Sequence, residues 1–344
     1  MDKKKLFNPS GKDTLENRKI LGGNSTNIFN LNNVKYQWAN NLYRNMMSNF
    51  WIPEKIDLTS DKNDFYNLSK EEQNAYEGIL SFLIFLDSIQ TNNLSNISEY
   101  ITAPEINLVL AIQTFQEAVH SQSYQYIIES IITKESRNNI YDRWRDDKIL
   151  FERNSYIAKI YQSFIDNPSK ETFIKVIIAD YLLEGLYFYN GFNYFYLLAL
   201  KGKMMGTSDI IKLINRDELT HVVLFQQLIK NIFEENPELL NEQIIYQMFD
   251  EAVKQEIIWT NHIIGNNISG ITYKTTEEYT KFLANKRLMN IGLKPLYPNS
   301  NKNPYINLEI FSDTEGAGNV KANFFEGTVT SYNMSSSIEG WDEF

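Results

Sequence analysis

The chain has 344 residues, of which 43% are hydrophobic and 22% charged, enough apolar material for a buried core and too little charge for a disordered chain. Its net charge of -10 offers no basic surface for nucleic acid or for an anionic membrane, and no apolar run is long enough to cross a bilayer. Cysteine is absent, so disulfides, zinc-thiolate sites and iron-sulfur clusters are excluded, and any metal must have oxygen and nitrogen ligands. We expect a cytoplasmic protein that binds neither nucleic acid nor a membrane.

The first half of the chain begins with a polar segment and continues with predicted helices. Residues 1–35 are rich in asparagine and lack sustained periodicity, so we predict an N-terminal arm there. Ser69 and Glu72 have the spacing of a capping box, and they open a helix that is apolar on nearly all sides and therefore buried. Pro104, at a first-turn position, opens a long helical segment that no proline or glycine interrupts. Residues 133–167 have a shorter and more charged helical pattern.

The second half of the chain is helical as well. One continuous helix is predicted over residues 169–202, and Thr207 or Ser208 is predicted to cap the start of the next. Two further helices are predicted at 238–264 and 276–291. All eight prolines lie outside the interiors of the predicted long helices, as continuous helices require. The pattern predicts an all-α fold.

The domain organisation follows from the same pattern. Residues 36–297 are predicted to form one helical domain, because the helices follow one another without a linker of different composition. After residue 297 the composition shifts towards asparagine, serine, glycine and threonine, so residues 298–344 are predicted to be a flexible tail. Its end places Trp341 and Phe344 among acids, which is typical of a short peptide that docks on a partner.

Two Glu-x-x-His pairs are the most informative pattern in the sequence. Two of the three histidines follow a glutamate by three residues, in Glu117-x-x-His120 and in Glu218-x-x-His221. Residues three apart on a helix lie on one face, so each pair can present a carboxylate and an imidazole to the same point. Each pair is therefore half of a candidate dinuclear metal site.

Two further acids complete the candidate site. Asp87 follows the apolar run ILSFLIFL, and Glu184 lies within YLLEGLYFY, where an unpaired charge would cost several kcal/mol. Ferritin-like dimetal proteins take one carboxylate from each of two helices and a Glu-x-x-His pair from each of two others, and the sequence matches this known arrangement. Four carboxylates and two imidazoles nearly balance two divalent cations and suit iron or manganese. We predict a ferritin-like helical bundle with all six residues as metal ligands.

Each of these residues also has an ordinary structural interpretation. A single Glu-x-x-His pair on a helix is more often a solvated pair than a ligand pair. Asp87 alone could lie at a helix end, and Glu184 could pair with a lysine or arginine. Asp180, one turn before Glu184, is the acid most easily mistaken for a ligand. His262 has no glutamate at this spacing, and we interpret it as a structural or surface residue.

The candidate ligands lie in segments that resemble a known family. FLDSIQ around Asp87, EAVHSQSY around His120, LLEGLYFYNGF around Glu184 and INRDELTH around His221 are similar to the four metal-binding segments of the class I ribonucleotide reductase small subunit. The similarity runs in order from NFWIPEK near residue 50 to GLKPLYP near residue 297. It implies two iron or two manganese ions that, with an oxidant, generate a tyrosyl radical. A large catalytic subunit then uses this radical to reduce ribonucleotides.

The resemblance also implies roles for individual residues. Tyr124, about one helical turn after His120, would carry the stable radical. Trp51 in NFWIPEK would take part in radical transfer, and Asp217 would link it to the imidazole of His120. Tyr332 in the tail would pass the oxidising equivalent onward. The apolar positions that would shield the radical are Phe188, Phe192 and Ile214.

The same resemblance implies partners. The large subunit would bind the C-terminal tail, the small subunit would form a homodimer, and a manganese form would need a flavodoxin-like activator protein. The absence of cysteine fits a subunit that does not reduce the substrate itself, because the family uses a cysteine thiyl radical for that step. The alternatives are another ferritin-like dimetal oxidase, desaturase or monooxygenase, a metal-storage protein, and a metal-free helical interaction protein.

Overall fold

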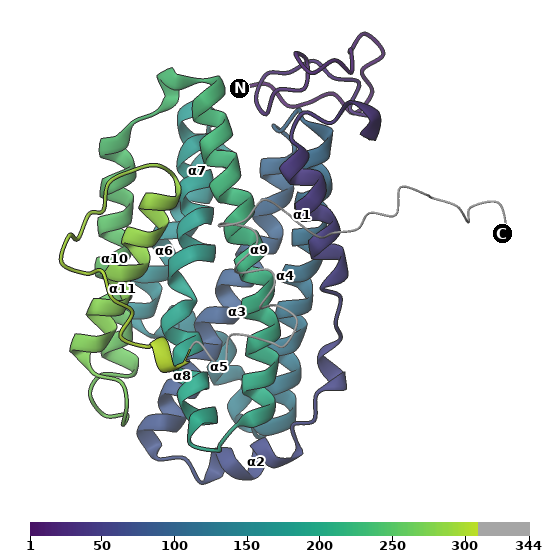
Figure 1. Ribbon diagram of the computed structural model, residues 1–344. Coiled ribbons are helices and arrows are strands. Elements are labelled where there is room, and N and C mark those ends of the chain that lie inside the picture. The colour runs from purple at the N-terminus through teal and green to yellow at the C-terminus, as the bar shows by residue number, and fades with distance from the viewer. Residues whose placement is uncertain (309–344) are drawn as a thin grey trace, which may run out of the picture.

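Helices account for all the regular secondary structure in residues 1–308, which are the residues that the computed structural model describes (Figure 1). No strand occurs within that range, and the predicted all-α fold class is confirmed. Among these residues, no helix combines the length and the apolar character needed to cross a membrane. The α-helices are α1 (Gln37–Ser48), α2 (Thr59–Tyr66), α3 (Lys70–Ser98), α4 (Pro104–Ile131), α5 (Lys134–Asp146), α6 (Lys148–Asp166), α7 (Lys170–Leu182), α8 (Tyr189–Leu200), α9 (Met205–Glu235), α10 (Glu242–Ile263) and α11 (Tyr273–Asn290).

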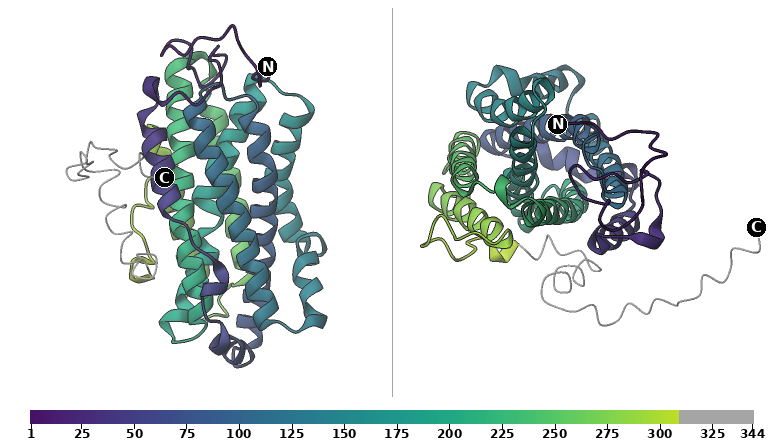
Figure 2. Two further views of the ribbon diagram at one scale, coloured as in Figure 1. Left: turned by 90° about the vertical axis from the view of Figure 1, so that its right-hand side faces the viewer. Right: turned by 90° about the horizontal axis from the view of Figure 1, so that it is seen from above.

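The long helices stand side by side as a bundle. Helices α3, α4 and α9 and the α7–α8 pair run along the same axis in two perpendicular views (Figures 1 and 2). Contacts join α3 to α4, α4 to α9, and α9 to both α7 and α8. The other helices cover this bundle: α1 packs on α4 and α9, α5 and α6 pack on α3, and α10 packs against α11 and α6. The arrangement is a ferritin-like bundle with extra helices.

Local sequence signals set where several of these helices begin. Ser69 and Glu72 form the predicted capping box at the start of α3, with each side chain bonded to the backbone of the other. Pro104 is the first residue of α4, where its missing N–H costs no intrahelical bond. Ser169 caps α7 together with Thr172. These three starts could be read from the sequence because each one depends on residues within a single turn.

The start of α9 differs from the prediction, which placed a cap at Thr207 or Ser208. The helix begins at Met205, after Met204 in the left-handed conformation with φ 55°. The carboxylate of Asp61 in α2 accepts the backbone N–H of Gly206 at 3.0 Å and of Thr207 at 2.6 Å. An acid from another helix therefore caps α9. Its negative charge also interacts favourably with the positive N-terminal end of the helix dipole. The prediction was wrong because the capping group is distant in the sequence.

The helix predicted over residues 169–202 is not continuous. A π-helical turn, Leu183–Tyr187, lies between α7 and α8 and contains Glu184. A π turn inserts an additional residue and widens the helix locally, and such turns are frequent at functional sites. All five of its residues are buried. Glu184 therefore lies where the helix is locally widened.

The N-terminal segment lies over one end of the bundle (Figure 1). It is irregular apart from the short 3-10 helix Leu31–Asn33. Arg18 and Glu105 form an ion pair at 2.9 Å in which both side chains are fully buried, and the same guanidinium donates to the carbonyl of Asn30 at 2.7 Å. Glu235 in α9 accepts the backbone N–H of Ile20 at 3.2 Å. These contacts fix residues of the predicted arm to the ends of α4 and α9.

The described part of the predicted tail, residues 298–308, returns to the bundle. Tyr305 is buried and its hydroxyl donates to Thr275 at 2.9 Å, and Leu308 is also buried. Tyr332, Trp341 and Phe344 lie outside the described residues. The docking tail therefore stays a prediction.

Candidate metal centre

Six buried side chains from four segments meet in the middle of the bundle. None of the six is exposed to solvent, and each segment contributes one or two of them. Helix α3 provides Asp87, α4 provides Glu117 and His120, the π turn provides Glu184, and α9 provides Glu218 and His221. The structure thus brings together all six of the residues predicted from the sequence.

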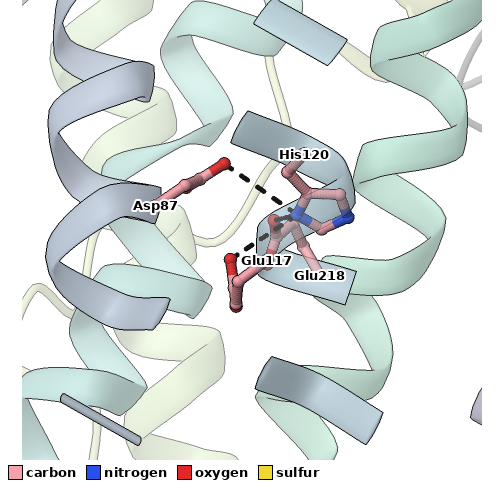
Figure 3. A group of neighbouring side chains, drawn as sticks. All are labelled: Asp87, Glu117, His120 and Glu218. Atoms are coloured by element: carbon pink, nitrogen blue, oxygen red, sulfur yellow. Dashed lines mark ion pairs between the residues drawn. The ribbon is translucent and has the colours of Figure 1, made fainter. Parts of the chain in front are cut away.

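In the first group of four residues, three acids surround one ring nitrogen of His120. Its Nδ1 lies 3.0 Å from Glu218 Oε1, 3.6 Å from Glu117 Oε2 and 3.9 Å from Asp87 Oδ2. Figure 3 shows the three acids pointing towards this nitrogen. One ligand atom from each of the four residues lies within 4.8 Å of the others. Three oxygens and one nitrogen thus converge on a volume suited to a metal ion.

The second group of four surrounds His221 in the same way. Its Nδ1 lies 2.9 Å from Glu218 Oε2, 3.1 Å from Glu117 Oε1 and 3.4 Å from Glu184 Oε2. The ligand atoms of these four residues again lie within 4.8 Å of one another. Glu117 and Glu218 belong to both groups, and each offers one oxygen to either side. The two groups therefore share two carboxylates, the geometry of a bridged pair of ions.

The donor atoms fit a pair of divalent cations. Both oxygens of Asp87, one oxygen each of Glu117, Glu184 and Glu218, and Nδ1 of His120 make no hydrogen bond with any described residue. Buried charged groups without partners are costly unless a metal satisfies them. No lysine or arginine in residues 1–308 forms an ion pair with any of the six. Two dications would balance the four carboxylates.

The pKa values of the cluster show how strongly its charges depend on one another. Burial raises the pKa of Asp87 and of Glu184 well above the ordinary range, and the charges of Glu117 and Glu218 raise both further. Burial acts in the same direction on Glu218 and is the largest single effect, but the charges of His221 and His120 together with hydrogen bonds to Glu184 and His120 outweigh it and lower the pKa of Glu218. Burial opposes protonation of both imidazoles, yet the charge of Glu218 raises their pKa values. Protons are thus held where cations would displace them.

A polar side chain contacts Nε2 of each imidazole and thereby orients the ring. His120 Nε2 lies 3.3 Å from Asp217 Oδ2, and the indole N–H of Trp51 donates to the same oxygen at 2.8 Å. His221 Nε2 lies 3.0 Å from Gln116 Oε1. These contacts leave Nδ1 of each ring facing the acids, as an outer partner of a metal-binding histidine does. Trp51 and Gln116 also line a cavity of about 180 Å³ between α1 and α4.

Three glutamines that contact the candidate ligands were missed by the sequence reasoning. Gln90 donates to Glu184 Oε1 at 2.7 Å, and Gln113 donates to the same oxygen at 2.8 Å. Gln90 follows Asp87 by three residues and Gln113 precedes Glu117 by four, so helical spacing places each on the ligand face of its helix. That spacing could have identified both. Gln116, which neighbours Glu117 in the sequence, carries no comparable signal.

Tyr124 lies on α4 about one turn after His120 and is fully buried. Its hydroxyl makes no hydrogen bond of acceptable geometry with a described residue, although Asp87 is near enough to affect its pKa. Burial, followed by the negative charges of Asp87 and Glu218, raises the pKa of Tyr124 well above its ordinary value. The phenol is therefore neutral. The predicted shielding residues are also buried: Phe188, Phe192 and Ile214.

Two other residues considered in the sequence lie outside both groups. Asp180 belongs to neither group; its Oδ1 forms a short hydrogen bond with the Tyr161 hydroxyl and accepts the amide N–H of Asn93 at 3.3 Å. The side chain of His262 is 38% exposed and lies 2.8 Å from Asp147, which caps α6. The distances support the interpretation of His262 as a structural residue.

A helical bundle in which two groups of four candidate ligands share two carboxylates is the arrangement of the ferritin-like dimetal-carboxylate proteins. The sequence matches the family described as "Ribonucleotide reductase, small chain" over residues 28–304. The chain therefore belongs to the ribonucleotide reductase small-chain family, and the resemblance inferred from its motifs is confirmed. The alternative of another dimetal oxidase or monooxygenase is not favoured, because the match extends along nearly the whole chain.

Individual relatives agree with this family. The chain is 45% identical to the ribonucleoside-diphosphate reductase subunit beta of Treponema pallidum (strain Nichols), over 98% of this chain and 97% of the relative. It is 37% identical to the same subunit of Halalkalibacterium halodurans, over 100% of this chain and 99% of the relative. Its structure is similar to the ribonucleotide reductase R2 subunit from Clostridium botulinum, with a TM-score of 0.89 and 47% identity. That similarity covers 91% of this chain and 99% of the solved one.

Proposed function

We propose that this chain generates a radical on Tyr124 beside a pair of metal ions and supplies it to a large subunit that reduces ribonucleotides. The observation that carries the proposal is the overlap of two ligand groups through Glu117 and Glu218, next to a buried phenol. Asp87 and His120 would complete the ligands of one ion, and Glu184 and His221 would complete those of the other. The family relationship supports the same activity.

The side chains in the proposal have distinct tasks. Glu117 and Glu218 would each offer one oxygen to either ion, and Asp217 and Gln116 keep each imidazole in the tautomer whose Nδ1 is free to bind. When bound, a pair of iron or manganese ions supplies, with an oxidant, the oxidising equivalent for the tyrosine. The protein contributes oxygen and nitrogen ligands that suit either metal, so the metal is left open between the two.

Tyr124 is suited to hold an unpaired electron for a long time. Oxidation of this phenol removes one electron, which the oxidant takes, together with the hydroxyl proton, because a phenol cation is not stable in a buried site. The carboxyl group of Asp87, which is near enough to affect the pKa of Tyr124, is the proposed proton acceptor. No solvent reaches the ring, and its hydroxyl has no hydrogen-bond donor among the described residues. Exclusion of water and of reductants by the surrounding core protects the neutral radical.

The proposed transfer route starts at Nε2 of His120, the ring nitrogen that points away from the candidate ligands. The imidazole, Asp217 and Trp51 form a chain of contacts of 3.3 and 2.8 Å, and Trp51 is only partly buried. Arg216 donates to the other oxygen of Asp217 at 3.4 Å and adds positive charge at this point. We propose that the oxidising equivalent leaves through Trp51 and passes to Tyr332 in the tail.

The proposed partners follow from the family. They are the large catalytic subunit, bound through the C-terminal tail that carries Trp341 and Phe344, and a second copy of this chain in a homodimer. A manganese form would also use a flavodoxin-like activator. Light scattering of the purified protein tests the homodimer, and a monomeric mass would contradict it.

Electron paramagnetic resonance tests the radical assignment. Protein loaded with ferrous or manganous ion and treated with oxidant is expected to show a tyrosyl signal that Tyr124→Phe abolishes. Tyr194→Phe is a matched control, because Tyr194 is equally buried but donates its hydroxyl to the backbone of Glu72. A tyrosyl signal that is unchanged in Tyr124→Phe would contradict the assignment.

Truncation tests the tail. Deletion of residues 333–344 is expected to abolish ribonucleotide reduction with the large subunit while the tyrosyl signal remains at full intensity. Both outcomes follow if the deleted segment docks on the partner and takes no part in building the metal centre. Loss of the signal in the truncated protein would mean that the tail has been assigned the wrong role.

A further inference from the structure

A buried acid and a buried tyrosine lie behind Glu184, outside both ligand groups. The hydroxyl of Tyr161, in α6, lies 2.9 Å from Gln90 Oε1 and forms a short hydrogen bond with Asp180 Oδ1. Gln90 Nε2 in turn donates to Glu184 Oε1 at 2.7 Å. Asp180 and Gln90 are fully buried, and Tyr161 is 4% exposed. These residues form a continuous chain of contacts from α6 to a candidate ligand.

The number of protons available to this series of contacts decides which hydrogen bonds can form in it. A phenol has one proton, but Tyr161 faces two oxygens that would both have to accept it if Asp180 were ionised. Gln90 cannot turn its amide nitrogen towards Tyr161 without losing the hydrogen bond to Glu184. If Asp180 is protonated, its hydroxyl donates to Tyr161, and Tyr161 donates to Gln90. Only this arrangement gives every close contact a donor and an acceptor.

The surroundings of Asp180 favour the protonated form independently. Its Oδ2 has no hydrogen-bond partner among the described residues, and Asn93 Nδ2 reaches only Oδ1, at 3.3 Å. A buried carboxylate with one unsatisfied oxygen would be costly. Burial raises the pKa of Asp180 to about 8, against the hydrogen bonds that lower it. A neutral Asp180 also leaves only four carboxylates to balance two dications.

We propose that protonated Asp180 and Tyr161 are positioning residues that lock the amide of Gln90 in one orientation and thereby direct Glu184 to its metal ion. This inference rests on the proposed dimetal site. Gln113 donates to the same Glu184 oxygen at 2.8 Å, so two amides converge on Oε1. Oε2 makes no hydrogen bond within residues 1–308, lies 3.4 Å from His221 Nδ1, and is the atom left to bind the ion. All hydrogen bonds in the chain run in one direction, from Asp180 to Glu184.

Manganese binding under anaerobic conditions tests the positioning role, with Mn(II) itself as the probe. Tyr161→Phe removes the hydroxyl that donates to Gln90 Oε1, so the amide is free to turn its oxygen towards Glu184. Outer partners of metal ligands are typically worth about 10- to 100-fold in metal affinity, and we expect a loss of that size for one of the two ions. The Mn(II) paramagnetic resonance spectrum is expected to change accordingly. Tyr194→Phe, which loses a buried hydroxyl elsewhere, is expected to bind both ions like the wild type.

Infrared difference spectroscopy of the Mn(II)-loaded protein tests the proton on Asp180 without using activity. The carboxylic-acid C=O stretching band is expected in the wild type, absent in Asp180→Asn, and shifted to higher frequency in Tyr161→Phe. Asp180→Asn is expected to keep both ions, because the carboxamide N–H₂ can replace the acid as the donor to Tyr161.

The outcomes separate this inference from the proposed function. Wild-type protein that binds no Mn(II) would overturn the dimetal site and this inference together. Wild-type protein that binds two ions, with Tyr161→Phe indistinguishable from Tyr194→Phe, would overturn the positioning role alone. A wild-type spectrum without the band that Asp180→Asn should remove would likewise overturn the protonated state of Asp180.

Discussion

Because the two groups share ligands, removal of Glu218 and removal of Glu184 are predicted to change the number of bound metal ions differently. Glu218 contacts the Nδ1 atoms of both histidines, at 3.0 and 2.9 Å, whereas Glu184 belongs only to the second group. Glu184→Ala leaves the first group with four ligands and the second with three. Glu218→Ala leaves both groups with three. We therefore expect Glu184→Ala to retain one tightly bound ion and Glu218→Ala to retain none.

The size of the effect depends on whether one ion or both ions lose a ligand. A direct ligand is worth at least as much as an outer partner, for which about 10- to 100-fold in affinity is typical. That range corresponds to about 1.4–2.7 kcal/mol for one ion. Removal of the Glu218 carboxylate acts on both ions and is expected to cost about twice as much in total, about 2.7–5.5 kcal/mol.

Anaerobic titration with Mn(II), followed by metal analysis of the desalted protein, measures this difference. Tyr194→Phe is the control, because Tyr194 is equally buried but belongs to neither ligand group and donates its hydroxyl to the backbone of Glu72. It is expected to retain two ions. Equal losses in Glu184→Ala and Glu218→Ala, or loss of both ions in Glu184→Ala, would refute the argument that Glu218 is shared and Glu184 is not.

Three further predictions concern other parts of the structure. Trp51→Phe removes the indole donor to Asp217 and is expected to abolish reduction with the large subunit while the tyrosyl signal persists; Trp38→Phe, whose indole N–H has no partner in the described residues, should retain activity. Arg153→Met leaves the buried Glu256 without its guanidinium and is expected to lower the free energy of unfolding by about 3–5 kcal/mol in urea, and a decrease below about 1 kcal/mol would contradict this. Asp147→Ala removes the cap of α6 and should cost about 1 kcal/mol at pH 7. Burial opposes ionisation of Asp147, but hydrogen bonds from His262 and the α6 backbone lower its pKa below the ordinary 3.8, so this stabilisation is present above pH 3.8 and lost on further acidification. Chemical unfolding of Asp147→Ala and wild type from pH 7 to pH 2 should converge, and a constant difference would contradict it.

Local sequence patterns were sufficient for much of the helical framework. The capping box at Ser69 and the proline at Pro104 start α3 and α4 where predicted, because a cap depends on residues within one turn. The start of α9 was not predictable in this way, because Asp61 from α2 supplies the capping oxygens. The π turn around Glu184 was not predictable either, since a continuous apolar pattern is equally compatible with an uninterrupted helix.

For the site, the sequence by itself determined which side chains could take part. Helical spacing places Glu117 with His120, and Glu218 with His221, on one face of each helix, and their apolar surroundings indicate burial. Only the tertiary structure decided that Glu117 and Glu218 each reach both histidines, and that Gln116, Gln90 and Tyr161 complete the hydrogen bonds around them. The physical reason is that spacing along one helix fixes the direction of a side chain. The partner it meets depends on how separate helices pack.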